Sequence, residues 1–251
     1  LEDINDDNFD LVRNYKIMAA VSKQGVSPEV YYTNAEHGLI LMQYVESKQF
    51  PEASPALIEK FATVIRNLHD SHSFQEWKSV VEIVAYFHQN LSSEHMQQAI
   101  IKKCMQEIKS MESFLYDADD MRSCHGDLNP ANVLFNGKDY ILVDWQTASP
   151  QSFYFDLACC ATWFYFYNED LSASFLTYYL GREATDKEKA KYYLMRIFVH
   201  VYYGVNFIAL ASQGSSDLPV LQDEEIKKLP PFSSFMQSIG SGQINLSDAD
   251  I

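Results

Sequence analysis

The apolar pattern near the N-terminal end predicts one helix followed by two strands. Residues 10–24 carry apolar side chains every three or four positions, which is the spacing of an amphipathic helix. The stretches 30–32 and 39–42 are rich in tyrosine and aliphatic residues and therefore predict strands. Residues 34–38, with the sequence NAEHG, supply the turn between these strands.

From residue 46 onward the pattern is mainly helical. Ser54 followed by Pro55 is a typical helix start, and apolar residues continue at helical spacing as far as Leu68. Further apolar-periodic segments predict helices at 76–90, 93–116, 155–168, 170–180 and 185–210.

One short β unit interrupts this helical part. Two apolar runs, 133–135 and 140–143, lie on either side of Asn136-Gly137, a residue pair typical of a tight hairpin turn. The sequence therefore predicts an α+β protein. A small N-terminal α/β piece leads into a mostly helical body with an inserted β-hairpin.

Composition and charge narrow the possible functions. The chain has 251 residues, of which 47% are hydrophobic, and this is a globular composition with enough apolar residues for a sizeable core. It carries 34 acidic and 19 basic residues, for a formal net charge of -15. Such a chain repels nucleic acid and anionic membrane surfaces, whereas it is compatible with a small cationic ligand. The alternative explanation is that the acidic residues only keep the protein soluble.

Cysteine usage and apolar runs predict a cytoplasmic protein without membrane insertion. The four cysteines form no C-x-x-C pair, which favours reduced core residues. Residues 1–10 are acidic and polar, unlike a signal peptide. The most apolar late stretch, residues 197–210, is too short to span a bilayer.

Chemically active side chains concentrate in residues 123–136, SCHGDLNPANVLFN, just before and within the hairpin. The hairpin should fold Asp144 back beside Asn132, and two oxygen donors at one point suit a hard cation such as Mg²⁺. Asp127, on the same loop, could accept a proton from a hydroxyl group near that metal. These groups are the minimal set for phosphoryl transfer. The alternative is an ordinary turn in which Asp and Asn bond their own backbone, but the combined spacing is much rarer than any single residue.

Four segments together resemble a known family. Residues 125–132 (HGDLNPAN) and 141–145 (ILVDW) are similar to motifs of the choline/ethanolamine kinase and aminoglycoside phosphotransferase superfamily, and bacterial choline kinase-like proteins are the nearest members. Residues 155–158 (FDLA) resemble the helix start that follows the metal-binding Asp in this family. Residues 39–45 (LILMQYV) resemble its strand and hinge. The resemblance covers most of the chain from about Arg13 onward.

The resemblance implies a protein-kinase-like fold with ATP and Mg²⁺ as cofactors. Residues 1–45 would form a partial N-terminal lobe and hinge. Residues 46–251 would form a helical C-terminal lobe that carries the catalytic loop and the acceptor site.

The resemblance also implies roles for single residues. Asp127 would be the catalytic base, and Asn132 and Asp144 would hold magnesium. The backbone of Gln43 and Val45 would bind the adenine.

Three further residues would have structural roles. His125 and Asp156 would brace the catalytic loop. His69, which also matches a family position, is interpreted as a buried, hydrogen-bonded histidine.

The chain departs from the family pattern at its N-terminal end. The family's glycine-rich loop over the phosphates should precede Arg13, but residues 1–12 contain no such loop, and no lysine that could grip the phosphates occurs before Lys16. The first helix should carry a Glu that pairs with this basic residue, but Asn14 stands at the matched position. Either the chain is a piece of a longer kinase, which we favour, or the protein is a degenerate kinase that lacks the lobe.

The sequence specifies the acceptor site less well than the catalytic and metal sites. In choline kinases a late helix carries two tryptophans, three residues apart, that enclose the choline ammonium group. His200 and Tyr203 occupy these positions here. Tyr203 can still form an aromatic wall, as can Trp163, whereas His200 could hydrogen-bond a polar substrate instead. Core packing is the alternative for each aromatic residue.

The sequence therefore predicts a phosphotransferase that uses ATP and Mg²⁺ to phosphorylate the hydroxyl group of a small, cationic alcohol, with choline or ethanolamine as the nearest models. An aminoglycoside or thiamine is the alternative acceptor. A non-catalytic pseudokinase or nucleotide-binding module is the alternative from another class. Asn14 and the missing lobe favour this last reading, and the intact Asp127, Asn132 and Asp144 oppose it.

Overall fold

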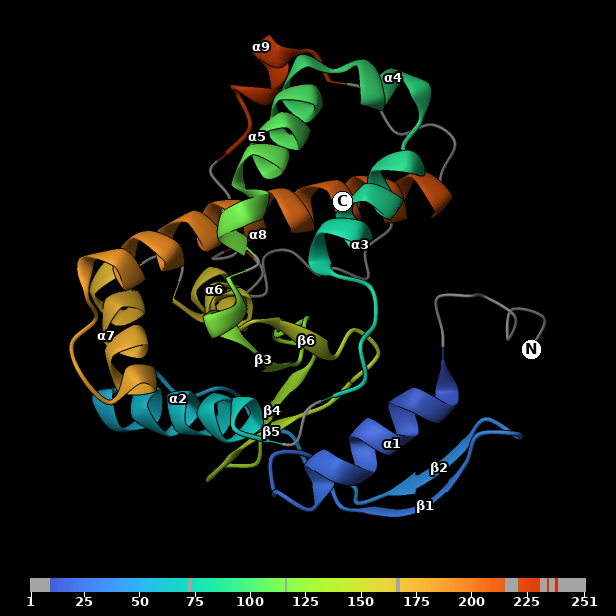
Figure 1. Cartoon of the computed structure of the whole chain (residues 1–251), viewed down its shortest axis with the longest axis vertical. Coiled ribbons are helices and arrows are strands. Elements are labelled where there is room, and N and C mark those ends of the chain that lie inside the picture. The colour runs from blue at the N-terminus through green and yellow to red at the C-terminus, as the bar shows by residue number, and fades with distance from the viewer. Residues whose placement is uncertain are drawn as a thin grey trace.

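The computed structural model describes residues 10–71, 74–115, 117–165, 168–214, 221–230, 234 and 238. Its first element is helix α1 (Leu11–Ser22), which begins at Asp10, whose carboxylate accepts a hydrogen bond from the Arg13 backbone N–H over 2.9 Å. Strands β1 (Val30–Asn34) and β2 (Leu39–Met42) follow as an antiparallel pair, and α1 packs against them (Figure 1). The predicted helix and strands are confirmed here.

The helical part begins with α2 (Pro55–His69) and α3 (Val80–Gln89). The predicted helix at 93–116 is wrong in one respect, because it is divided into α4 (Ser93–Gln97) and α5 (Ala99–Leu115). Gln98, between them, has extended backbone angles (φ -57°, ψ 135°) that end α4. The later helices are α6 (Phe153–Phe164), α7 (Glu169–Leu180), α8 (Asp186–Gly214) and the short α9 (Asp223–Ile226).

Two small antiparallel sheets lie within this helical part. The predicted hairpin forms as β4 (Val133–Phe135) and β5 (Tyr140–Leu142), with Val133 opposite Leu142. A second pair, β3 (Met121–Cys124) and β6 (Ser149–Ser152), was not predicted. The sequences of these two strands, MRSC and SPQS, contain no β-branched or aromatic residue, and a proline such as Pro150 is typical of a strand end or edge. The β3–β6 pair encloses the loop and hairpin between residues 125 and 148.

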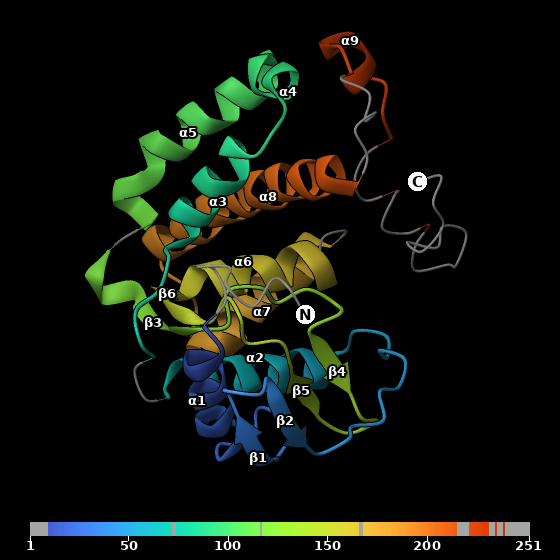
Figure 2. The same cartoon turned by 90° about the vertical axis from the view of Figure 1, so that its right-hand side faces the viewer.

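The core is built around α6 and α8. Every residue of α6 from Phe153 to Thr162 is buried, and the Phe155 ring packs on Phe198 and Tyr202 of α8. Helices α3 and α5 contact α8 as well, and α2 contacts α7. Figure 2 shows these layers in succession, from α5 and α3 through α8 and α6 to α2.

Helix α8 is longer than the apolar stretch noted in the sequence. By length and composition its residues Asp186–Ala211 could cross a membrane. The burial of Phe198 and Tyr202 against α6 also fits the core helix of a globular fold. The expected absence of membrane insertion stays a prediction, as does the division into two lobes at residue 45.

Candidate active site

A buried carboxylate holds the start of the loop between β3 and β4. Asp156, on α6, is fully buried and accepts hydrogen bonds from the backbone N–H groups of His125 (2.7 Å) and Gly126 (2.9 Å). His69, on α2, lies 3.0 Å from the same carboxylate. Burial alone would raise the pKa of Asp156, but the His69 hydrogen bond and charge and the Gly126 N–H hold it below its ordinary value. An ionised carboxylate therefore fixes two successive loop residues.

The His125 ring joins this loop to the end of β5. Its Nδ1 accepts a hydrogen bond from the Asp127 N–H (3.3 Å), so Nε2 carries the proton that is donated to the Val143 carbonyl (2.9 Å). The fully buried Trp145 packs 4.7 Å from the His125 ring. The residues on both sides of Asp144 are thereby attached to the loop that carries Asp127.

Both carboxylate oxygens of Asp127 accept hydrogen bonds. The Asn132 amide donates to Oδ2 (3.0 Å) and also to the Asp127 carbonyl (2.9 Å). The Tyr203 hydroxyl of α8 donates to Oδ1 over 2.9 Å. Burial raises the pKa of Tyr203 well above its ordinary value, so the phenol keeps its proton and acts as a donor. The side chains of Asn132 and Tyr203, from two distant parts of the sequence, thus meet at the Asp127 carboxylate.

The β4–β5 register brings Asp144 to the same place. The Val143 N–H donates to the Asn132 carbonyl over 3.0 Å, so Asp144 follows directly after the residue paired with Asn132. Asp144 is exposed, and within the described ranges no group donates a hydrogen bond to its carboxylate. The Asn132 side-chain oxygen likewise has no donor among the described residues. A charged carboxylate and a neutral amide oxygen, neither with a hydrogen-bond donor among the described residues, are ligands suited to Mg²⁺.

The backbone at Asp144 is unusual. Its φ is 65°, and it is the only residue other than glycine with positive φ in the part of the chain that the structure describes. This left-handed conformation is disfavoured for most side chains, although Asp and Asn adopt it more readily. It persists only where neighbouring contacts hold it.

The predicted adenine-binding backbone lies just after β2. The Gln43 N–H already donates to the Glu29 carbonyl over 2.7 Å, as a continuation of the β1–β2 pair. The Val45 N–H makes no hydrogen bond to any described residue. Val45 therefore retains a backbone donor for a ligand, whereas the Gln43 donor is in use.

An aromatic group lies beside Asp127. The Trp163 ring of α6 packs edge-on against Tyr203, with centroids 5.1 Å apart. Phe207, one helical turn after Tyr203 and 48% exposed, stacks on Tyr203 at 5.8 Å. Trp163 and Tyr203, both predicted substrate residues, are thus in contact, and Phe207 joins them although sequence reasoning did not name it.

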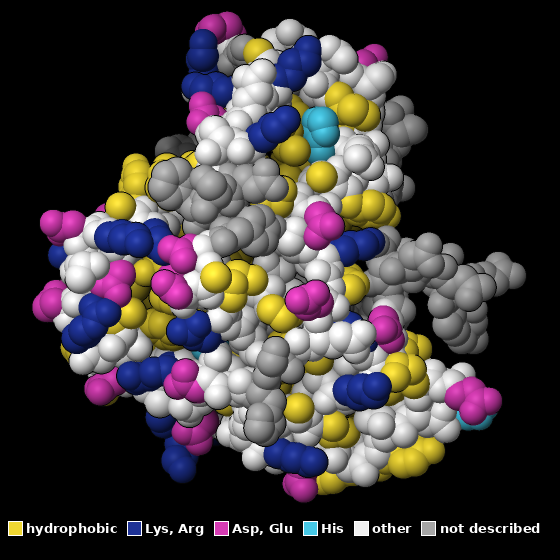
Figure 3. All heavy atoms as spheres, viewed as in Figure 1, with side chains coloured by type: hydrophobic (Ala, Val, Ile, Leu, Met, Phe, Trp, Pro, Cys, Tyr) yellow, Lys and Arg dark blue, Asp and Glu magenta, His cyan; other side chains and the backbone are white. Residues whose placement is uncertain are grey.

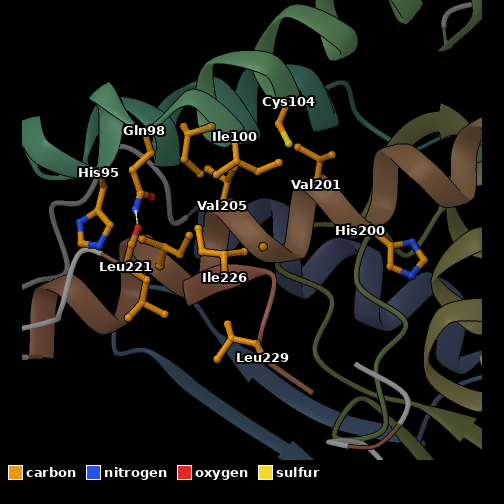
Figure 4. Close-up of a pocket in the computed structure, with 13 residues that line it drawn as sticks. His95, Gln98, Ile100, Cys104, His200, Val201, Val205, Leu221, Ile226 and Leu229 are labelled. Carbon is orange, nitrogen blue, oxygen red and sulfur yellow. Dashed lines mark hydrogen bonds between the residues drawn. The ribbon is translucent and has the colours of Figure 1, made fainter. Parts of the chain in front are cut away.

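His200 points elsewhere. Its Nδ1 lies 2.6 Å from the Arg196 carbonyl one turn earlier on α8. It lines a cavity of about 490 Å³ between α8, α4, α5 and the segment around α9, with mainly apolar walls (Figure 4). Tyr203 is not among the residues that line this cavity.

Two other contacts were missed in the sequence. The Thr147 hydroxyl donates to the His125 carbonyl over 3.0 Å. The position of Thr147, three residues after Asp144, could have indicated a role near the site. The Tyr179 hydroxyl lies 2.8 Å from Nδ1 of His69, and nothing local in the sequence marks this residue.

The sequence model of the phosphotransferase enzyme family matches residues 10–193. A comparison with curated protein sequences finds no match.

Several solved structures have a similar fold. Choline kinase LicA from Streptococcus pneumoniae is 18% identical, with a TM-score of 0.67 over 84% of this chain and 75% of that one. A choline/ethanolamine kinase family protein from Mesorhizobium loti is 17% identical, with a TM-score of 0.65 over 93% of this chain and 84% of that one. Amicoumacin kinase hAmiN, solved in complex with AMP-PNP, Ca²⁺ and Ami, is 14% identical, with a TM-score of 0.60 over 95% of this chain and 79% of that one. LicA has also been solved with AMP.

Proposed function

Because the chain belongs to the phosphotransferase enzyme family, we propose that it transfers the γ-phosphate of ATP to the hydroxyl group of a small, cationic alcohol. The fold is α+β and protein-kinase-like, as the sequence resemblance predicted. The observation that carries the proposal is the group formed by Asp127, Asn132 and Asp144 at the ends of one loop and one hairpin.

Asp127 is the proposed base. The acceptor hydroxyl would donate a hydrogen bond to its carboxylate and pass its proton there while the hydroxyl oxygen bonds to the γ-phosphorus. The bond from that phosphorus to the β–γ bridging oxygen breaks, and ADP leaves. The hydrogen bonds from Asn132 and Tyr203 fix the orientation of the Asp127 carboxylate. The base would therefore already face the acceptor hydroxyl group before the reaction begins.

Asn132 and Asp144 are the proposed magnesium ligands. The Asn132 amide nitrogen is engaged with Asp127, which leaves its side-chain oxygen for a metal, and the Asp144 carboxylate has no donor among the described side chains. A bound Mg²⁺ would neutralise charge on the phosphates. The AMP and AMP-PNP bound to similar proteins support nucleotide use. The backbone of Gln43 and Val45 is the proposed adenine contact, and Val45 is the stronger candidate because the Gln43 N–H already binds the Glu29 carbonyl.

The aromatic group supports a cationic acceptor. Tyr203, whose hydroxyl contacts Asp127, is buried, and the half-buried Trp163 and the exposed Phe207 pack on its ring. The faces of such rings attract ammonium groups. Choline and ethanolamine are the acceptors suggested by the similar kinases. An antibiotic of the aminoglycoside or amicoumacin type is the second candidate, because amicoumacin kinase has a similar fold. His200 lines the other cavity and is the weakest of the proposed substrate residues.

The test is ADP release with ATP and Mg²⁺ across choline, ethanolamine, thiamine and several aminoglycosides. We expect one acceptor class to be turned over, and Asp127→Ala to lower the rate by about 10²–10⁴-fold with an unchanged circular dichroism spectrum. Asp139→Ala is the matched control, because Asp139 lies at the far end of the hairpin, paired with Lys60. Full activity of Asp127→Ala would disprove the assignment of the base. Nucleotide binding without turnover of any acceptor would favour the pseudokinase.

A further inference from the structure

Arg13 is a buried cation on α1 that forms no ion pair with a carboxylate among the described residues. It is 2% exposed, and no acidic side chain of the described residues forms an ion pair with its guanidinium group. Burial lowers the pKa of Arg13, with Asp10 opposing this effect. The ring of Trp77 lies 4.9 Å from the guanidinium carbon. Burying a charge without a counter-charge destabilises a fold unless other polar groups compensate.

Backbone carbonyls provide that compensation. Nη1 of Arg13 donates to the Gln146 carbonyl over 3.2 Å, and Nη2 donates to the Ala148 carbonyl. These carbonyls lie two and four residues after Asp144, whereas Arg13 lies more than 130 positions earlier in the chain. A planar guanidinium group can grip two carbonyls at once, which a single ammonium group does less well.

Asn14 takes part in this contact. It is 4% exposed, and its side-chain oxygen accepts a hydrogen bond of 3.0 Å from Nη1 of Arg13. The family resemblance leads one to expect a Glu at this position, paired with a basic residue of a preceding strand. Here the residue faces inward and orients Arg13 instead. Helix α1 is therefore attached to the segment after Asp144 by its own side chains.

The other side of the same segment contacts the Asp127 loop. The Thr147 hydroxyl donates to the His125 carbonyl over 3.0 Å. Gly126 lies so close that a Cβ atom there would come within 2.6 Å of the Thr147 carbonyl oxygen. Residues 146–148 are thus held between Arg13 and the loop, and this segment begins two residues after Asp144, whose backbone is left-handed.

We propose that Arg13 is a positioning residue that holds residues 146–148 and thereby keeps the Asp144 carboxylate aimed at the metal. The inference rests on the proposed function, since it assigns Arg13 a role in the magnesium site. Arg13 itself contacts backbone carbonyls and not the reacting atoms. Partners that orient a metal ligand without touching the metal change metal affinity strongly when they are altered.

The first test measures binding of Mn²⁺ together with AMP-PNP, by loss of the electron paramagnetic resonance signal of free Mn²⁺. We expect Arg13→Lys to weaken Mn²⁺ binding by roughly tenfold, because one ammonium group cannot hold both carbonyls. Arg66→Lys, the same change on α2, is the matched control and should bind as the unaltered protein does. Asp144→Asn removes the charge of the proposed metal ligand, so its Mn²⁺ binding tests the proposed function itself.

The outcomes separate the two proposals. If Asp144→Asn binds Mn²⁺ as well as the unaltered protein, Asp144 is not a metal ligand and both proposals are wrong. If Asp144→Asn loses binding and Arg13→Lys does not, the proposed function stands and the role of Arg13 alone is wrong. Should Arg13→Lys fail to fold, Asn14→Ala removes the orienting amide and should weaken binding a few-fold.

Hydrogen exchange in the metal-free protein gives an independent reading. The Ala148 N–H donates to the Trp145 carbonyl over 3.2 Å and reports on the order of this segment. We expect it to exchange faster in Arg13→Lys than in Arg66→Lys. Equal exchange in the two variants would show that Arg13 does not hold the segment.

Discussion

At the scale of the residue, one carboxylate organises the candidate site. Asp127 receives hydrogen bonds from Asn132, five residues away, and from Tyr203, 76 residues away. The first contact follows from the local motif and could be predicted from it. The second depends on how α8 packs, so the sequence suggested Tyr203 only as an aromatic wall and gave no sign that its hydroxyl meets Asp127.

Tyr203→Phe tests that hydroxyl, because it keeps the ring and removes the donor. A hydrogen bond to a charged group contributes about 1.5–3 kcal/mol, so we expect kcat to fall by roughly tenfold or more, with a small change in the KM of the acceptor. Tyr203→Leu should in addition raise that KM if the ring binds a cation. Tyr193→Phe, an exposed tyrosine of the same helix, is the control. An unchanged kcat in Tyr203→Phe would show that the hydroxyl does not assist Asp127.

At the scale of the element, the helices and the hairpin could be predicted from local pattern, and the β3–β6 pair could not. The apolar periodicity of α2 and the Asn136-Gly137 turn are signals carried within a few residues. Strands β3 and β6 lack such signals, and they pair because the folded body brings Ser123 opposite Pro150. The contacts of Arg13 with Gln146 and Ala148 are equally non-local, so no reading of either segment alone predicts them.

Gly126 shows how tightly the loop is packed against its neighbour. Its φ is +82°, and an added Cβ atom would lie 2.6 Å from the Thr147 carbonyl oxygen. We expect Gly126→Ala to lower the free energy of unfolding by about 2 kcal/mol or more, because strain and contact act together. Gly204, within α8, has no atom within 4 Å of such a Cβ, so Gly204→Ala should instead stabilise by about 0.5–1 kcal/mol. Urea unfolding of both variants checks the two signs.

At the scale of the whole molecule, the site is assembled where several elements converge. Helix α1, the β3–β4 loop, the end of β5 and helices α6 and α8 each supply a residue (Figure 1). The net charge of the chain is -15, and on the face in Figure 3 acidic and basic side chains are interspersed. The aromatic group beside Asp127 therefore supports a cationic acceptor better than the overall charge does.

The acidic groups also set the pH range of stability. The hydrogen bonds from Arg182 and Thr185 lower the pKa of Glu188 to about 2, and the pKa of Asp156 is also below its ordinary value. A folded-state pKa below the unfolded value stabilises the protein above the unfolded value, and this stability is lost as pH falls toward the folded value. We therefore expect the melting temperature to fall as pH drops from about 4.5 to 2. Glu188→Gln should make the fall shallower, and a melting temperature unchanged to pH 3 would contradict this account.

The contact between Arg13 and Ala148 spans 135 residues, and this has a consequence for synthesis of the chain. At about 5–20 residues per second, a ribosome adds Ala148 roughly 7–27 seconds after Arg13. During that interval the α1 segment lacks the carbonyls that compensate its charge, and its guanidinium group stays in water. Tyr203, which completes the hydrogen bonds of Asp127, is translated later still. The candidate site can therefore form only after Tyr203 has been translated, when the first and last of its parts are present together.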